Sequence, residues 1–352
     1  MRREEPEACG AICPLCAHKD AGPTGLALAD VFEDSDGDVR FGMLRCVHEA
    51  CQGEFPIIDG VPVVRADARD ALASGQHALR RREDLPPEME RVLADTVEPG
   101  SSEDIDRYYL SVYARDAYPA DGGVPGVVRL MDEALGLIPG GLDVGKSVLE
   151  LGCAVGRCCF ELAARGHERV VGLDANLTML RCASGVRAHA EAIYTAKRSG
   201  VLYDPVRVPV GLEGRARVSL WCGDALAPAF AEGSFDCVLA LNVLDCVASP
   251  VQLLERAAAM LRPGGRLVLT SPYDWSTSAT ALGAWVGGHS PRSDLGGDSA
   301  GVLRSLLTPG SGGQTIEGLR LVAERDGLEW ATRLHERAEL RYRVHAVVAE
   351  RV

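Results

Sequence analysis

The chain has 352 residues, a formal net charge of −13 at pH 7 and 47 % hydrophobic residues. This length suffices for two domains, or for one large domain with an appendage. The acidic balance argues against a nucleic-acid partner, because nucleic-acid binders usually carry a basic face, and we expect the basic run at 80–82 to be a solvated helix face. No apolar run reaches the ~18 residues of a membrane span, and the start lacks the apolar stretch of a signal peptide. We therefore expect a cytoplasmic protein with no membrane segment.

Twelve cysteines occur in this chain, and in a reducing compartment their spacing decides between metal binding, chemistry and packing. Four of them form a C-x-x-C pair and a second pair about thirty residues further on: Cys13, Cys16, Cys46 and Cys51. Two such pairs, separated by strand-like runs, predict a tetrahedral structural zinc site with four thiolate ligands. His48 and Cys9 lie close by in the sequence, so either can replace one ligand.

The other cysteines are expected to serve packing. Six lie in apolar periodic segments and are predicted to be small core residues: Cys158, Cys159, Cys182, Cys222, Cys237 and Cys246. Cys153 lies in a glycine turn, where we expect a packed residue rather than a nucleophile.

Composition divides the chain into three parts. Residues 1–68 are predicted to form a zinc ribbon, and residues 69–100, which are charged and contain Pro86 and Pro87, a linker. Residues 101–352 are predicted to form the main domain, which opens with a helix in 101–119 behind a Ser/Asp-rich cap. Tyr109 and Tyr113 share one face of that helix, and such a helix can cover a bound ligand.

From residue 146 onward, strand-like and helix-like segments alternate. We expect strands in 146–153, 168–175, 217–225, 235–245 and 266–272, and helices in 158–166, 176–200 and 249–265. Residues 276–315 are a long insertion rich in Gly, Ser and Thr. The tail 318–352 is predicted to be helix, strand, turn and strand, which adds an antiparallel hairpin to the sheet edge. This alternation predicts an α/β fold with a doubly wound, Rossmann-like, mostly parallel sheet, whose ligand lies beyond the carboxyl ends of the strands.

Acidic and glycine residues follow these strands. The first strand ends in E-x-G-x-x-x-G, which lacks the dinucleotide spacing and suits a ligand without a pyrophosphate. Glu150 can hold an ammonium group, Asp174 ribose hydroxyls and Asp224 an adenine amino group. The candidate cofactor-binding residues are Glu150, Gly152, Cys153, Gly156, Asp174, Ala175, Gly223, Asp224, Ala225 and Asn242.

Taken in order, the segments ELGCAVGR, GLDA, GDA, FDCVLALNVL and LRPGGRL resemble the class I methyltransferase family. This resemblance implies that the cofactor is S-adenosylmethionine. The longer segments LNVLDCVASPVQLLERAAAMLRPGGRLVLTSPYDW and AWVGG resemble the methyltransferase domain of ovothiol biosynthesis, which methylates an imidazole nitrogen of a mercaptohistidine. The sulfoxide synthase part of the bifunctional ovothiol enzymes has no counterpart here.

The resemblance implies an acceptor site after the fourth and fifth strands. Asn242, Asp245 and Tyr273 are the candidate catalytic residues. Trp275 can stack on a flat ring or a cation, and Trp285 lies on a loop, with Gly287 and Gly288, that can close as a lid. We expect His289 to be structural or solvated.

The segment FPIIDGVP at 55–62 resembles the tail of Trm112-like zinc ribbons, which are partners or activators of methyltransferases. The sequence therefore predicts a small-molecule N-methyltransferase that acts on a mercaptohistidine-like imidazole. An rRNA or tRNA methyltransferase and a protein or peptide histidine methyltransferase are the alternatives, and a regulatory module without catalysis is the non-enzyme hypothesis. The oligomeric state stays open.

Overall fold

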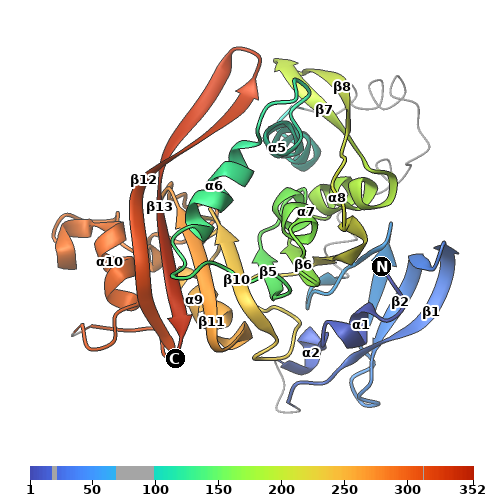
Figure 1. Cartoon of the computed structure of the whole chain (residues 1–352), viewed down its shortest axis with the longest axis horizontal. Coiled ribbons are helices and arrows are strands. Elements are labelled where there is room, and N and C mark those ends of the chain that lie inside the picture. Colours follow the sequence, from blue (N-terminus) through green and yellow to red (C-terminus); the bar gives the residue numbers. More distant parts are fainter. Residues whose placement is uncertain (18–21, 69–98, 312) are drawn as a thin grey trace.

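The computed structural model describes residues 1–17, 22–68, 99–311 and 313–352 (Figure 1). Nearly all of the predicted linker, including the basic run at 80–82, lies outside the described residues. No helix in the described part of the chain has both the length and the apolar character that crossing a bilayer requires.

A seven-stranded sheet organises the larger part of the molecule, with strand order β12-β13-β11-β10-β5-β6-β9. Strand β13 pairs antiparallel with both of its neighbours, and the other pairings in the sheet are parallel. The strands are β5 (Ser147–Leu151), β6 (Arg169–Asp174), β9 (Val218–Cys222), β10 (Phe235–Leu241), β11 (Leu261–Ser271), β12 (Leu319–His335) and β13 (Ala338–Arg351). The predicted Rossmann-like fold and its edge hairpin are confirmed.

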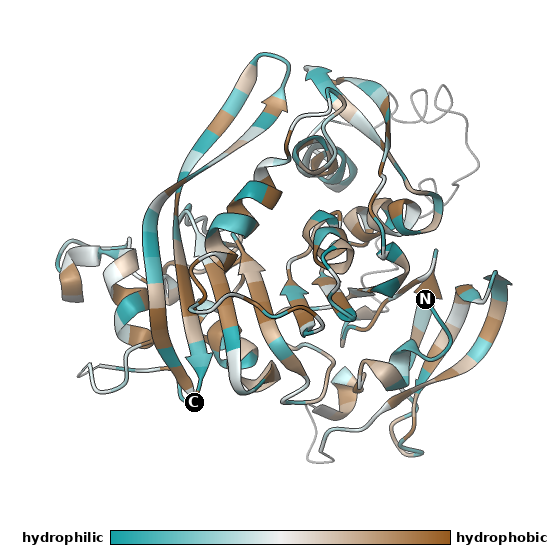
Figure 2. Ribbon diagram, viewed as in Figure 1, coloured by the Kyte–Doolittle hydropathy of each residue, from teal (hydrophilic) through white to brown (hydrophobic). Residues whose placement is uncertain are grey.

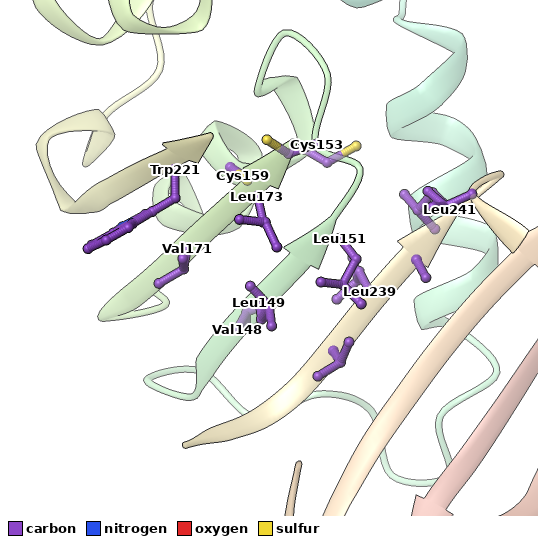
Figure 3. Close-up of a cluster of buried hydrophobic side chains, with 14 of the residues drawn as sticks. Val148, Leu149, Leu151, Cys153, Cys159, Val171, Leu173, Trp221, Leu239 and Leu241 are labelled. Atoms are coloured by element: carbon purple, nitrogen blue, oxygen red, sulfur yellow. The ribbon is translucent and has the colours of Figure 1, made fainter. Parts of the chain in front are cut away.

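Helices cover this sheet because its central strands are apolar on both faces. Every residue of β5 and β9 is buried, which a parallel sheet achieves only with helices packed on both sides. Figure 3 shows this core, to which β5, β6 and β10 contribute Leu149, Val171 and Leu239. The helices are α5 (Ser102–Ala117), α6 (Gly126–Leu135), α7 (Arg157–Ala164), α8 (Leu177–His189), α9 (Pro250–Met260) and α10 (Ser299–Leu306).

Capping residues begin several of these helices where the sequence predicts. The Ser101 side chain accepts from the backbone N–H of Asp104 at the start of α5, and Ser249 does the same for Gln252 at the start of α9. Each cap satisfies an amide that has no partner within the helix.

The predicted helix at 176–200 is wrong in its second half. Helix α8 ends at His189, Ala190 takes a left-handed conformation, and the chain continues as the hairpin β7 (Glu191–Ser199) and β8 (Leu202–Pro209). The buried residues of β7 alternate along the strand, which is the period of a half-buried strand rather than of a helix. Gly200, with φ +52°, lies at the hairpin turn.

The predicted helix at the start of the tail is also wrong. Residues 319–335 form one long strand, β12, whose ladder with β13 contains three irregularities. The helix of this region lies earlier, in the predicted insertion, where the Asp298 side chain caps α10. Figure 2 shows hydrophilic colours toward the tip of the β12-β13 hairpin and hydrophobic colours along the central strands.

Two of the predicted core cysteines are less buried than expected. Cys246 is exposed and Cys182 is half-buried, whereas Cys158, Cys159 and Cys237 belong to the core. Cys246 follows the carboxyl end of β10 in a short turn, where the side chain leaves the sheet and faces outward.

The N-terminal residues form a four-stranded antiparallel sheet, in the order β1-β2-β3-β4. Its elements are α1 (Glu5–Ala8), α2 (Pro14–Ala17), β1 (Leu26–Ser35), β2 (Asp38–Cys46), β3 (Glu54–Ile58) and β4 (Val61–Pro62). Arg181 and Arg187 of α8 form ion pairs with the buried Asp59 and Glu5 of this module. Each of these buried carboxylates is therefore compensated by a cation from the larger sheet's helices.

Close packing of α7 on β6 allows only glycine at position 172. A Cβ there would lie 2.8 Å and 2.9 Å from the sulfur atoms of Cys153 and Cys159. We expect Gly172→Ala to lower the free energy of unfolding by about 1–3 kcal/mol, because the core must shift. The matched control is Gly185→Ala in α8, where an added Cβ meets no atom within 4 Å. This substitution should raise the free energy of unfolding by up to ~1 kcal/mol. Urea unfolding of both variants tests this, and equal stabilities for the two would contradict it.

Candidate active site

The predicted cofactor residues lie at the carboxyl edge of β5, β6, β9 and β10, because parallel neighbouring strands end on the same side of the sheet. The first of the turns at this edge, residues 152–156 between β5 and α7, is short and tightly packed. Gly152 and Gly156 have φ of +73° and +76°, in the region that glycine adopts without strain. A Cβ on Gly152 would lie 2.4 Å from the side chain of Val243. The turn therefore fits closely under the loop that follows β10.

Asp174 joins the turns after β5 and β6. One carboxylate oxygen accepts from the backbone N–H of Ala154 and the other from that of Asn176, both at 2.8 Å. Burial raises the pKa of this carboxyl, and the N–H donors oppose the rise. Each carboxylate oxygen can accept more than one hydrogen bond, so two neighbouring hydroxyls of a ligand can still bind here.

Glu150 lies beneath the first turn and is buried. Its Oε2 accepts from the thiol of Cys159 at 2.9 Å. Burial raises the pKa of this carboxyl to about 7, while the Cys159 thiol lowers it and the nearby Asp174 raises it further. The carboxyl group thus changes charge near neutral pH. Its predicted contact with an ammonium group stays a prediction.

Gly223, Asp224 and Ala225 follow β9, the outermost parallel strand. The Gly223 N–H donates to the backbone carbonyl of Asp174 at 2.9 Å, which sets this loop against the turn after β6. Asp224 is exposed and accepts from the N–H of Leu226. The hydrogen bond between Gly223 and Asp174 places the loop after β9, which is predicted to contact adenine, next to Asp174, which is predicted to contact the ribose.

Helix α5 covers this edge of the sheet. Its Asp106 accepts from the side-chain amide of Asn176 at 3.1 Å, which ties the helix to the turn after β6. Tyr113 lies further along the helix, stacks at an angle against Tyr109 with ring centroids 6.4 Å apart, and has its pKa raised by burial. The charges of Asp174 and of groups after β10 and on β13 also raise this pKa.

The loop after β10 holds Asn242 and Asp245 in fixed positions. Asn242 has φ +53°, and its side-chain oxygen accepts from the hydroxyl of Thr270 at 2.9 Å. Asp245 is 3 % exposed and accepts from the N–H of Asp274 at 2.6 Å. Burial raises the pKa of the Asp245 carboxyl. A left-handed asparagine beside a buried carboxylate is the kind of strained arrangement that gathers at functional sites.

Aromatic rings continue the site beyond β11. Trp275 stacks on Trp285 with ring centroids 5.9 Å apart and lies 6.3 Å from the ring of Tyr273. The Trp275 indole donates to Ser299, so the insertion closes over this stack. A Cβ on Gly288 would lie 2.9 Å from Trp275. His289 is exposed and contacts the carbonyl of Gly287 in its own loop.

Residues 149–269, about a third of the chain, match a family model described as "Methyltransferase domain". This segment runs from β5 into β11 and includes every predicted cofactor turn. The chain contains a class I, S-adenosylmethionine-dependent methyltransferase domain.

The names of proteins related to this domain indicate different kinds of acceptor. Nocamycin O-methyltransferase of Saccharothrix syringae is 29 % identical over 56 % of this chain and 64 % of its own length. Norajmaline N-methyltransferase of Rauvolfia serpentina is 24 % identical over 43 % and 45 %. A tRNA U34 carboxymethyltransferase of Idiomarina loihiensis is 28 % identical over 36 % and 32 %. The chain thus spans less than two thirds of these relatives, and they leave the acceptor class open.

Residues of the N-terminal module border the cofactor edge of the methyltransferase domain. Val63 forms a parallel bridge with Cys222 at the end of β9. The next residues, Val64 and Arg65, donate to the carbonyls of Cys222 (2.7 Å) and Ala175 (3.1 Å). A cavity of about 150 Å³ lies here, lined by Pro14, Val64, Arg65, Ala66, Asp67, Asp224 and Ala227. No spacing in the sequence signals these contacts, which join residues more than 100 positions apart.

A second contact from the same module fixes the far end of the loop after β9. Ile12 donates to the carbonyl of Ala229 at 2.7 Å, and Ala231 donates to that of Gly10 at 3.0 Å. Residues 10–12 and 63–65 therefore hold the loop 223–231 at both of its ends. Residues 10–12 directly precede Cys13, so this contact is continuous with the cysteine cluster.

The four predicted zinc ligands lie together. The sulfur atoms of Cys13, Cys16, Cys46 and Cys51 are all within 4.8 Å of one another. Two of the separations are 3.7 Å (Cys13–Cys51) and 3.6 Å (Cys16–Cys46). Four sulfurs around a tetrahedral zinc with Zn–S of about 2.3 Å lie about 3.8 Å apart, so these thiols fit such an ion. Cys9 lies outside the cluster.

We expect Asp174→Ala to weaken S-adenosylmethionine binding by about 1–3 kcal/mol, because hydrogen-bonding partners lose their acceptor. The matched control is Asp236→Ala, since the half-buried Asp236 likewise accepts from a backbone N–H, that of Ser147, but at the opposite, amino ends of β5 and β10. Calorimetric titration of both variants tests the assignment. Unchanged affinity in Asp174→Ala, or equal losses in the two variants, would contradict it.

Proposed function

We propose that the protein transfers the methyl group of S-adenosylmethionine to an imidazole nitrogen of a small, mercaptohistidine-like acceptor. The observation that carries this proposal is the chemistry of the surfaces around Asp245. The Tyr342 hydroxyl donates to Asp274 at 3.0 Å, and Asp274 in turn donates its backbone N–H to Asp245. Carboxylates and phenols thus meet where the loops after β10 and β11 leave the sheet.

These groups suit a planar, cationic molecule. Aromatic faces attract flat rings and ammonium groups, and a buried carboxylate favours a positively charged partner. An amino acid with an imidazole ring offers both features. A lipid would require a mainly apolar pocket, and a polyanion would be repelled by the carboxylates and by the net charge of −13.

The bound cofactor supplies a methyl group on a sulfonium, and the chain supplies alignment and a water-poor site. We assign the ribose to Asp174, the adenine to the residues after β9 and the glycine turn to the rest of the cofactor. Asn242, Asp245 and Tyr273 are assigned to the acceptor. An imidazole attacks through a neutral nitrogen, so a strong base is unnecessary for the attack itself.

We further propose that residues 1–68 are a Trm112-like zinc ribbon fused to the methyltransferase domain at 101–352 through the linker 69–100. The spacing of the four sulfurs supports zinc, and the contacts of residues 10–12 and 63–65 support a role beside the cofactor. The twelve cysteines all lie within the described residues and form no disulfide there, which agrees with an action in the reducing cytoplasm.

The acceptor assignment predicts a clear order of activities. With S-adenosylmethionine, we expect methylation of 5-mercaptohistidine above that of histidine, and none of a histidine-containing peptide or of ribosomal RNA. Labelled methyl transfer followed by mass spectrometry of the products measures this. Methylation of the RNA alone would establish an RNA methyltransferase instead. Methylation of the peptide alone would keep imidazole chemistry but discard the small acceptor, and cofactor binding without any transfer would indicate a regulatory module.

The zinc assignment predicts one zinc ion per chain in protein purified without added metal. We expect Cys16→Ser to lose this ion and to lower the stability of the N-terminal module, because small domains commonly depend on a metal. The matched control is Cys9→Ser, since Cys9 is equally buried but lies outside the cluster. Elemental analysis with thermal unfolding measures both effects. A folded wild-type protein without zinc, or loss of the ion in Cys9→Ser, would contradict the assignment.

A further inference from the structure

A chain of polar side chains leaves the acceptor site through the sheet. The Tyr273 hydroxyl lies 2.7 Å from Nδ1 of His345, and Nε2 of His345 lies 3.1 Å from a carboxylate oxygen of Glu324. Arg304 of α10 holds that carboxylate at 2.7 Å. His345 is 2 % exposed, whereas the Glu324 side chain is 30 % exposed. The chain thus connects a half-buried phenol to a carboxylate that reaches solvent.

The fold fixes this connection in two ways. His345 of β13 is in register with Ser271, the last residue of β11, so the residues after β11 pass close to its ring. Tyr273 has φ +56°, and its N–H donates to the side chain of Ser271 at 3.0 Å. A left-handed backbone conformation is strained for a tyrosine, and such strain is typical of functional sites.

The surroundings of Tyr273 favour transfer of a proton through its hydroxyl over formation of a phenolate anion. Burial raises the pKa of Tyr273, and four carboxylates raise it further: Asp245 after β10, Asp298 at the start of α10, and Glu324 and Asp326 of β12. A phenolate is therefore disfavoured, and Tyr273 can release its proton only as it receives another. His345 is the group placed to accept that proton.

We propose that Tyr273, His345 and Glu324 form a proton relay that removes the N–H proton of the acceptor during methyl transfer. This inference rests on the proposed function. Transfer forms the new N–C bond and breaks the S–C bond of the sulfonium, which leaves the imidazole ring cationic. Loss of its other N–H proton restores a neutral ring. That proton passes to the Tyr273 oxygen, the phenol proton to Nδ1 of His345, and the Nε2 proton through Glu324 to solvent.

The relay assigns different roles to its members. Tyr273 is the catalytic residue, because it meets the acceptor. His345 and Glu324 are positioning residues that act through Tyr273. The arrangement requires the His345 tautomer with its proton on Nε2, since Nδ1 must accept from the phenol and Nε2 must donate to the carboxylate.

The test compares Tyr273→Phe, His345→Asn and the double variant in the full chain, with 5-mercaptohistidine and S-adenosylmethionine. We expect each single variant to lower kcat at least tenfold, within the usual range for proton transfer, while the KM for the acceptor and the Kd for S-adenosylmethionine stay within about twofold. The double variant should be no slower than the slower single variant, because the two residues act in one chain. Tyr194→Phe is the matched control, since it removes a buried hydroxyl bonded to the Tyr118 carbonyl.

A solvent isotope effect separates the relay from simple structural support. Because the relay moves protons during methyl transfer, the kcat of the wild type should fall in D₂O, and His345→Asn should show a smaller effect. Nitrogen-15 NMR of labelled histidine should show His345 as the Nε2–H tautomer. An Nδ1–H tautomer, an unchanged kcat in His345→Asn, or parallel losses of kcat and cofactor affinity would overturn the relay. If the wild type methylates only RNA, the imidazole assignment fails. If it methylates only the peptide, the small-acceptor assignment fails. In either case the same variants judge the relay on that acceptor.

Discussion

The parallel pairing of β5 with β6 is the constraint on which the site depends. It places the carboxylate of Asp174 within hydrogen-bond distance of Ala154 in the neighbouring turn. This contact and the N–H groups of Gly152 and Cys153, which donate to the Leu173 carbonyl, fix the glycine turn. The turn in its fixed position packs against Val243 of the loop after β10. A displacement of Asp174 would therefore change the turn after β5 and the loop after β10 together. Gly172 in turn lets the thiols of Cys153 and Cys159 pack directly on the face of β6.

Much of this arrangement can be predicted from sequence, because it rests on local signals. Glycines at fixed offsets after an apolar strand, a Ser at a helix start, and acidic residues at strand ends each have a short-range physical cause. The C-x-x-C pair likewise predicts its partners, since four sulfurs around one ion accept few spacings. The alternation of strands and helices predicts a mostly parallel sheet, although it does not fix the order of the strands.

The features that sequence reasoning missed depend on distant contacts. The segment after His189 has residues that fit a helix, yet Ala192 and Tyr194 are buried on one face of β7, which packs against α5. Tertiary packing there overrides local propensity. His345 shows no local signal either, because its partners Tyr273 and Glu324 come from two other elements. Arg65 reaches Ala175 across 110 positions. Such pairs are visible only once the sheet order is known.

The loop 223–231 has a consequence for the order in which the chain matures. Residues 10–12 pair with residues 229–231, and residues 63–64 pair with Cys222. A ribosome releases the N-terminus first, so the first 68 residues cannot dock on the loop 223–231 until some 160 more have been made. Closing so long a loop is slow compared with local folding. Residues 10–12 and 63–65 must remain unpaired until the loop 223–231 has been made. Early binding of zinc would let residues 1–68 fold by themselves before that loop is available.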